Sequence, residues 1–312
     1  MAKKLISKQR SESSLKKAVR FLRSKGRLIR RTIWLFEKKV SIKFRARKLS
    51  KNYHFRDCSQ LNHNSIDNGV VVSILIPSRE RPKELCNVLK NISETLKEPS
   101  NVEVLVRLDE DDKLSLKKQE EFFKAAGLVN LRILVGPRKR GYYDLHIFVN
   151  ELASVSKGDF LLLFNDDSIF TSIAWDIELL KRRNELAVFN TSTPENPQRN
   201  IFPVVHRHIF EIIGHFAQSP FNDAYIQEVA EFAGIHQDLP TIEIKHLRDQ
   251  MTDQTFIETN TLQGACTEHF NSISSVNQRI HDATLLVCYI TKFGNTITIP
   301  KASVTYYHQE KG

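Results

Sequence analysis

Four short apolar runs between residues 70 and 164 constrain the fold of this chain more than any other feature. Each is short enough to be a strand buried on both faces: VVVSILIP (70–77), VEVLVRL (102–108), LRILV (131–135) and DFLLLF (159–164). Segments with helical patterns separate them, over residues 85–96, 115–126 and 145–152. This alternation predicts an α/β fold with a mostly parallel, doubly wound sheet flanked by helices.

Clusters of charged residues follow each of these runs. They are Ser78-Arg79-Glu80-Arg81, Asp109-Glu110-Asp111-Asp112, Arg138-Lys139-Arg140-Gly141 and Asn165-Asp166-Asp167. Parallel sheets bind ligands at the carboxyl ends of their strands, so we expect these clusters to share one rim. Acidic and basic side chains together suit a metal ion with a phosphate-bearing ligand, whereas each cluster alone could be a solvated turn. The chain has no GxGxxG or Walker loop, which argues against a Rossmann dinucleotide site or a P-loop.

Composition describes a globular protein from a reducing compartment. Hydrophobic residues make up 41% of the chain and charged residues 26%, which is too apolar for a disordered protein. The four cysteines are scattered and form no CxxC pair, so we expect neither a zinc cluster nor a disulfide framework. No apolar run approaches the roughly 20 residues needed to cross a bilayer. The start, MAKKLISKQR, lacks an apolar signal core, and we expect a cytoplasmic location.

The positive charge is concentrated in an N-terminal arm. Residues 1–56 hold 20 Lys or Arg against two acids, a net charge of +18, whereas the rest of the chain carries −8. Apolar residues recur in the arm at spacings of three or four, with one wider step across Gly26, namely Leu15, Val19, Leu22, Ile29, Ile33, Phe36 and Val40. This pattern predicts amphipathic helices with a cationic face. It favours peripheral binding to an anionic membrane, on its inner face, over a helical brace packed on the body. A nucleic-acid arm ranks third, because no nucleic-acid motif accompanies the charge.

Three segments in their order resemble the nucleotide-binding half of GT-A fold glycosyltransferases, specifically the family 2-like branch: VSILIPSRERP, VEVLVRLDEDD and GDFLLLFNDD. The third segment lies where that family has its DxD motif, here in the variant form Asn165-Asp166-Asp167. The resemblance covers roughly residues 70–250 and implies a Rossmann-like GT-A domain over 66–255. Its nucleotide-sugar half would be 66–168 and its acceptor half 169–255. A basic helical arm (1–65) and a helical C-terminal extension (256–312) would flank it.

The resemblance also implies roles for individual residues. Ser78, Arg79 and Arg81 would line the nucleotide pocket, and Asp109 or Asp111 would bind the base or ribose. Asp167 would bind Mn²⁺ or Mg²⁺, with Asp166 beside it at the ribose or metal. Four further residues would bind or steady the donor: Arg138 and Arg140 at the diphosphate, Gly141 through close backbone approach, and Asn150 on the preceding helix. Such a cation would stabilise the departing diphosphate, and hard cations prefer the oxygen ligands that Asp provides.

The acceptor half offers a candidate general base. Asp223 begins a helical pattern where the family presents its catalytic acid, and it would take a proton from the acceptor hydroxyl during an inverting transfer. The alternative is that Asn222 or Asp223 only caps this helix. Glu228, one turn further along the helix, is the reserve candidate.

The histidines are harder to assign. His246 follows a likely strand, TIEIK, and is either a metal ligand beside the aspartates or a structural residue. We interpret His206, His208 and His215 as acceptor-pocket or surface residues, and Trp175-Asp176 as packing near the acceptor. Beyond residue 255, the pattern predicts a helix over 273–291 and a short strand in TITIP.

These observations predict a metal-dependent, inverting glycosyltransferase. Its substrates would be a nucleoside diphosphate sugar and a glycan or lipid-linked acceptor. One alternative is a nucleotidyltransferase, although that class usually has a glycine-rich loop after the first strand and PSRERP has no glycine. Another alternative is a non-catalytic membrane or nucleic-acid adaptor built on a transferase-like body.

Overall fold

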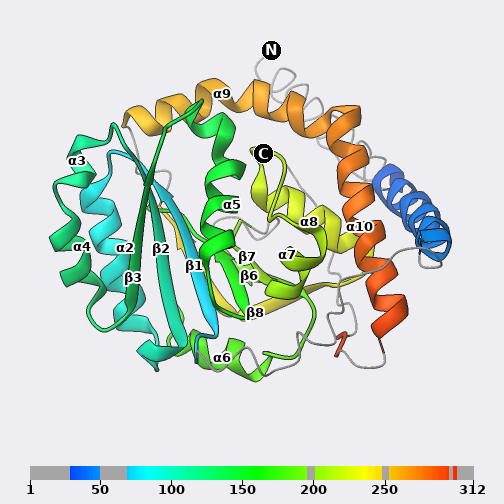
Figure 1. Ribbon diagram of the computed structural model, residues 1–312, viewed down its shortest axis with the longest axis horizontal. Coiled ribbons are helices and arrows are strands. Elements are labelled where there is room, and N and C mark those ends of the chain that lie inside the picture. Colours follow the sequence, from blue (N-terminus) through cyan, green and yellow to red (C-terminus); the bar gives the residue numbers. More distant parts are fainter. Residues whose placement is uncertain (1–28, 50–68, 195–200, 248–252, 295–297, 301–312) are drawn as a thin grey trace, which may run out of the picture.

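The computed structural model describes residues 29–49, 69–194, 201–247, 253–294 and 298–300. The expected helices of the arm before residue 29, and residues 50–68 that follow it, therefore lie outside the described residues. Residues 29–49 form one helix, drawn in blue in Figure 1 and called helix 29–49 below. Within the described ranges, no helix is both long and apolar enough to cross a membrane.

A single eight-stranded sheet runs through the molecule in the order β3-β2-β1-β4-β7-β6-β8-β5. Its first four strands coincide with the four apolar runs and pair in parallel: β1 (Val72–Ser78), β2 (Val102–Asp109), β3 (Asn130–Gly136) and β4 (Phe160–Leu163). The parallel, doubly wound half predicted from the sequence is therefore confirmed.

The second half of the sheet is mixed. Its strands are β5 (Ser168–Phe170), β6 (Val188–Ser192), β7 (Pro203–His206) and β8 (His236–His246). β6 pairs with β8 in parallel, whereas β4 with β7, β6 with β7, and β5 with β8 are antiparallel. Each antiparallel pair thus includes a strand from beyond the nucleotide half that the resemblance implied.

Helices cover both faces of the sheet (Figure 1). They are α2 (Pro82–Thr95), α3 (Lys113–Leu116), α4 (Gln119–Ala126), α5 (Leu145–Val155), α6 (Trp175–Lys181), α7 (Arg207–Ile213), α8 (Asn222–Ala233), α9 (Gln254–Asn271) and α10 (Ile273–Phe293), with short 3-10 turns η3 (Pro99–Asn101) and η4 (Gly141–Asp144). The single helix expected over 115–126 is divided into α3 and α4. The expected helix over 273–291 is confirmed as α10, and of the expected strand in TITIP the described residues show one bridge, from Thr298 to Glu185.

The buried strands feed two hydrophobic cores. Side chains alternate across a strand, so Ile74 and Ile76 join one cluster and Leu75 joins the other. The first cluster lies against α2, α4 and α6, and the second against α5, α7, α8, α10 and helix 29–49. Burial on both faces explains why these strands are continuously apolar.

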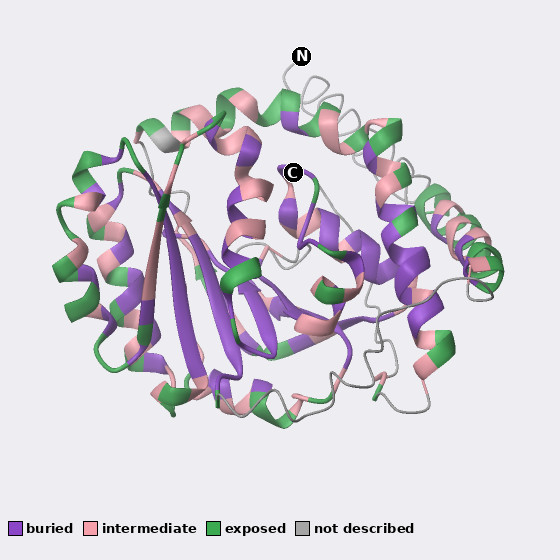
Figure 2. Ribbon diagram, viewed as in Figure 1, coloured by how far each residue is buried: buried purple, intermediate pink, exposed green. Residues whose placement is uncertain are grey.

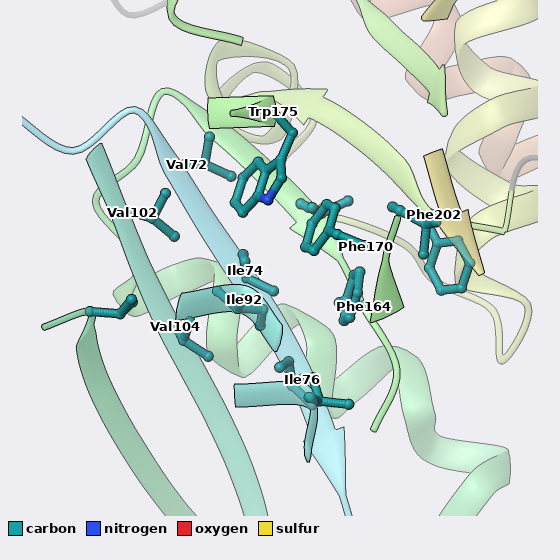
Figure 3. Close-up of a cluster of buried hydrophobic side chains, with 14 of the residues drawn as sticks. Val72, Ile74, Ile76, Ile92, Val102, Val104, Phe164, Phe170, Trp175 and Phe202 are labelled. Atoms are coloured by element: carbon teal, nitrogen blue, oxygen red, sulfur yellow. The ribbon is translucent and has the colours of Figure 1, made fainter. Parts of the chain in front are cut away.

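Trp175 anchors α6 to the first core (Figure 3). The Trp175 ring stacks on Phe170 with centroids 4.2 Å apart, and its indole N–H donates to the Thr95 hydroxyl at 3.1 Å. Buried Asp176 accepts bonds from the backbone N–H groups of Lys97 (2.8 Å) and Glu98 (3.0 Å). Neither residue lines the cavity described below, so their expected packing near the acceptor stays a prediction.

Helix 29–49 packs on the body. Leu35 and Ile42 are buried in the second core, and Ala46 is buried as well. Arg31 makes an ion pair with Glu231 of α8 at 3.2 Å. One side of this helix therefore packs on the body, as the alternative of a helical brace predicted.

Candidate functional site

A cavity of about 410 Å³ opens at the carboxyl ends of β1, β2 and β4. Nine of the residues expected at the site line it: Ser78, Arg79, Arg81, Asp109, Gly141, Asp166, Asp167, Asp223 and His246. The side chains of Asp111, Arg138, Arg140 and Asn150 do not line it. The sheet thus brings together residues separated by more than 160 positions in the sequence.

The parallel register explains why the first and last clusters meet. Leu75 of β1 pairs with Leu163 of β4, so the residues three positions further, Ser78 and Asp166, lie at the same level beyond the sheet. The Ser78 hydroxyl donates to Asp166 Oδ2 at 2.8 Å. Backbone pairing of two distant segments therefore builds this contact.

Arg81 holds the two adjacent aspartates together. Its Nη1 lies 2.9 Å from Asp166 Oδ1 and 3.3 Å from Asp167 Oδ2, and all three side chains are buried. Burial raises the pKa of Asp166 to about 6, even though the Arg81 charge acts in the opposite direction. Burial alone would lower the pKa of Arg81, but hydrogen bonds to Asp253 and then the Asp166 charge raise it, so the guanidinium stays protonated. A permanent cation therefore lies beside the aspartate pair.

His246 lies on the other side of Asp167. Antiparallel pairing of β5 with β8 places His246 opposite Ser168, and its Nε2 is 3.0 Å from Asp167 Oδ1. The amide nitrogen of Asn165, at the first position of the motif, is 3.5 Å from the same ring nitrogen. The expectation that His246 would lie beside the aspartates is therefore met in space.

These residues suit a divalent cation whose remaining coordination positions are filled by a bound ligand. No group of three or more His, Cys, Asp or Glu residues that could hold a metal occurs among the described residues. Mg²⁺ sites at phosphates commonly use only one or two carboxylates, and the phosphate oxygens and water fill the remaining positions. Asp167 with His246 offers one carboxylate and one imidazole, and Asp166 offers a second carboxylate. These three side chains therefore fit as ligands of a cation that is bound jointly with a diphosphate.

A second cluster lies at the end of β2. Arg79 Nη1 contacts Asp109 Oδ2 at 3.0 Å and Asp111 Oδ1 at 2.5 Å, and this hydrogen bond lowers the pKa of Asp111. Arg107, which the sequence analysis missed, is buried, makes an ion pair with Asp109 and lies 4.1 Å from the Phe148 ring centroid. Its signal in the sequence was a lone basic residue within the apolar run VEVLVRL. Arg79 and Arg107 thus fix Asp109 from two sides.

The residues after β3 depart from their expected roles. Arg138 pairs with Glu258 of α9, and the Arg140 guanidinium turns back to Asp144 at 2.6 Å. Neither side chain lines the cavity, so in this structure neither arginine is placed to contact a diphosphate bound there. Gly141 does line it, with a positive φ of 58°, and a Cβ at this position would collide with the Glu258 carboxylate. Glycine is therefore favoured at this turn.

Asn150 supports the site from α5 without lining it. Its side-chain oxygen accepts from the backbone N–H groups of Phe216 (2.7 Å) and Ala217 (3.3 Å), and its Nδ2 donates to the Ala217 carbonyl at 2.8 Å. These bonds fix the loop that leads into α8.

Asp223 enters the cavity from the first turn of α8. The N-cap residue of this helix is Phe221, not Asn222 or Asp223, and the Phe221 side chain makes no capping hydrogen bond. The capping alternative for Asn222 or Asp223 is therefore wrong. The reserve candidate Glu228 is buried outside the cavity, in an ion pair with Arg279 of α10.

Two histidines interpreted as acceptor-pocket or surface residues are buried structural groups. His206 Nε2 lies 3.2 Å from the Arg183 carbonyl, and His215 Nε2 lies 2.9 Å from Asp282 of α10. Neither lines the cavity, so that interpretation is wrong for both. Half-buried His208 also lies outside the cavity wall.

The start of α9 closes one side of the cavity, which the sequence analysis did not anticipate. Asp253 accepts from Arg81 Nε at 2.7 Å and from Nη2 at 2.8 Å, and it also caps α9 through the Phe256 N–H at 2.8 Å. Glu258 pairs with Arg138 and lines the cavity. Two arginines expected to bind the donor are thus held by carboxylates of the C-terminal helices. The only signal in the sequence was an acid at a helix start.

Comparisons with known proteins show the fold. No protein-family model matches the chain, and no curated protein matches it in sequence. The mannosyltransferase PcManGT from Pyrobaculum calidifontis, solved with GDP-Man and Mn²⁺, superposes with a TM-score of 0.51 at 10% identity, covering 86% of each chain. Residues 1–349 of S. aureus TarS, solved with UDP-GlcNAc, give a TM-score of 0.45 at 12% identity, covering 73% of this chain and 74% of that one. This chain has a GT-A-like glycosyltransferase fold, as the resemblance predicted.

Proposed function

We propose that this chain is a glycosyltransferase that moves a sugar from a nucleoside diphosphate sugar to an acceptor hydroxyl. The observation that carries the proposal is the cavity at the carboxyl ends of the strands. It combines an aspartate pair, a histidine and three arginines, Arg79, Arg81 and Arg107, with a further acid, Asp223. A similar fold in a protein solved with GDP-Man and Mn²⁺ supports it.

In this proposal the donor lies along the ends of β1, β2 and β4. Asp109 accepts hydrogen bonds from the ribose or base, since its carboxylate lines the cavity and is held by Arg79 and Arg107. Arg79 and Arg81 provide positive charge for the diphosphate, and guanidinium groups suit phosphate oxygens because they offer paired donors. A cavity of about 410 Å³ is within the usual size of small-molecule sites.

Mn²⁺ or Mg²⁺ would be held by Asp167 and His246, with Asp166 as a further oxygen ligand or a ribose contact. When bound, such a cation stabilises the negative charge that develops on the departing diphosphate. Asp167 and His246 are already in contact at 3.0 Å, so little rearrangement is needed to present both to one ion.

Asp223 acts as the general base in this proposal. Its carboxylate takes the proton of the acceptor hydroxyl while the hydroxyl oxygen attacks the anomeric carbon of the donor sugar. The bond between that carbon and the diphosphate oxygen breaks, and the nucleoside diphosphate leaves with the bonding electrons. Attack opposite to the leaving group inverts the anomeric centre. The acceptor is a glycan or a lipid-linked glycan.

Thermal melting with UDP, GDP, CDP and dTDP, each with and without Mn²⁺, tests the donor site. A nucleotide at 100 times its dissociation constant stabilises the folded state by about 2.7 kcal/mol. In a chain of this size that is a shift of a few degrees. We expect one nucleotide to shift the melt with Mn²⁺ present, and Asp167→Asn to abolish the shift.

The matched control is Asp238→Asn, which changes a half-buried aspartate of β8 outside the cavity. It should retain the shift of the wild-type chain. No shift with any of the four nucleotides, with or without metal, would contradict the proposal.

A further inference from the structure

A row of large apolar side chains lies exposed along helix 29–49. The exposed fractions are high for five of them: Ile29 (58%), Ile33 (52%), Phe36 (68%), Val40 (52%) and Phe44 (75%). Their spacings of four, three, four and four residues place them within about 80° of the helix circumference. Continuous exposed apolar surface of this kind marks an interaction site. We refer to these five residues as the outer stripe.

The opposite side of the same helix is fixed to the body. Leu35, Ile42 and Ala46 are buried, and the Trp34 ring lies 5.3 Å from the Phe232 ring of α8. These residues lie roughly 120–160° around the helix from the middle of the outer stripe. The helix therefore cannot turn to bury the stripe without losing its packing, and its outer side is largely exposed in Figure 2.

The charge around the stripe indicates what it binds. Helix 29–49 contains eight Lys or Arg residues and one acid, Glu37. Exposed cations flank the stripe on both sides, among them Arg30, Lys43 and Lys48. A second copy of this helix laid on the stripe would bring eight more cations against these. An anionic lipid surface instead supplies negative charge along the whole helix, and its acyl chains accept the aromatic side chains.

We infer that the outer stripe of helix 29–49 docks this protein on an anionic lipid membrane. The helix lies in the plane of the interface, with Phe36 and Phe44 in the boundary between head groups and acyl chains. Lys43 and Lys48 lie at the level of the head groups, where each cation contributes through the negative surface potential. The inner side of the helix keeps its contacts with the body, so the docked protein has one defined orientation. This inference does not depend on the proposed catalytic function.

Vesicle flotation with the full-length chain tests the inference. Vesicles of phosphatidylcholine alone are compared with vesicles that also contain phosphatidylserine, at low and at raised salt. We expect binding to the anionic vesicles only, weakened by salt because the attraction is screened. The double variant Phe36→Gln/Phe44→Gln should lower the affinity by at least about tenfold. Replacing Lys43 and Lys48 by Gln should lower it by about fivefold for each lysine.

Matched controls change residues of the same type and exposure elsewhere. Phe123→Gln removes a half-exposed phenylalanine on α4, and Lys124→Gln removes an exposed lysine beside it. Both should bind as the wild type does. Absence of wild-type binding, equal binding to uncharged vesicles, or full binding by the phenylalanine double variant would each overturn the inference. So would light scattering that shows a dimer in solution that this double variant dissociates, since the stripe would then bind a second copy.

Discussion

The Arg81 guanidinium contacts both aspartates at the end of β4. Arg81→Gln removes the charge but retains a side chain of similar length. Asp166 and Asp167 would remain buried side by side without it, with only 6% and 7% of their surfaces exposed. Removing one partner of a buried ion pair typically lowers the free energy of unfolding by about 3–5 kcal/mol.

The measurement is thermal and urea unfolding of the full chain. For a protein of this size, 3–5 kcal/mol corresponds to a fall in Tm of roughly 5–8 °C. Arg79→Gln is the matched control. Its partner Asp111 is about half exposed, and its buried partner Asp109 keeps the ion pair with Arg107, so we expect a loss near 1 kcal/mol. The second variant Asp166→Asn, combined with Arg81→Gln, should recover part of the stability because one buried charge is gone.

A divalent cation should partly replace the missing guanidinium. Mn²⁺ binds the folded state at the freed carboxylates, so it should raise the Tm of Arg81→Gln more than that of the wild type. A fall in Tm no larger than that of Arg79→Gln would refute the reasoning, because the aspartates would then not depend on Arg81 for compensation. An equal rise in Tm with Mn²⁺ in the wild type and in Arg81→Gln would refute only the prediction that the cation replaces the guanidinium.

Three further predictions concern other parts of the site and fold. Asp223→Asn should lower turnover by about 10²–10⁴-fold while leaving the nucleotide-induced melting shift unchanged, because a general base acts on the acceptor and not on donor binding. The double variant Asp253→Asn/Glu258→Gln should tighten binding of the nucleoside diphosphate, measured by calorimetry, because it frees Arg81 and Arg138 from competing carboxylates. Burial lowers the pKa of His146 to about 4, below its ordinary value near 6.5. Neutral His146 therefore favours folding above pH 6.5, and this contribution is lost as the pH falls towards 4. His146→Gln should flatten that part of the stability curve.

Each of these has its own control and contrary outcome. Loss of the melting shift in Asp223→Asn would mean that the residue binds the donor. Unchanged or weaker nucleotide binding in the α9 variant would mean that Asp253 and Glu258 support the cavity instead of competing for its arginines. His281→Gln changes an exposed histidine of α10 and should leave the pH dependence unaltered. An equal effect from both histidine variants would contradict the assignment to His146.

The sequence was enough to place the nucleotide half of the fold. Continuous apolar runs such as VSILIPS are a local property that indicates a strand buried on both faces, and the alternating helices required parallel pairing. The carboxyl ends of parallel strands must share one rim, which is why Ser78, Asp109 and Asp166 could be expected together. The similar fold of PcManGT agrees with the predicted α/β fold.

Contacts between distant segments could not be read in the same way. His246 meets Asp167 only because β8 pairs with β5 in one register, and a shift by one residue would turn the imidazole to the other face. Arg138 and Arg140 follow a strand end as expected, yet their side chains are held by Glu258 and Asp144 outside the cavity wall. Nothing in the sequence indicated that His215 would be buried in contact with Asp282.

The sequence by itself determined which residues form the strands, which charges follow them, and that the arm carries an apolar stripe among cations. These are properties of short segments, set by side-chain periodicity and burial. Only the tertiary structure decided that Leu35 and Ile42 pack on the body while Phe36 and Phe44 stay exposed, because helix 29–49 is apolar on two sides and the body contacts one of them. It also decided that Asp253, 172 residues from Arg81, holds this cavity-lining arginine in place. Pairing across such a distance depends on how the whole sheet and its covering helices are assembled.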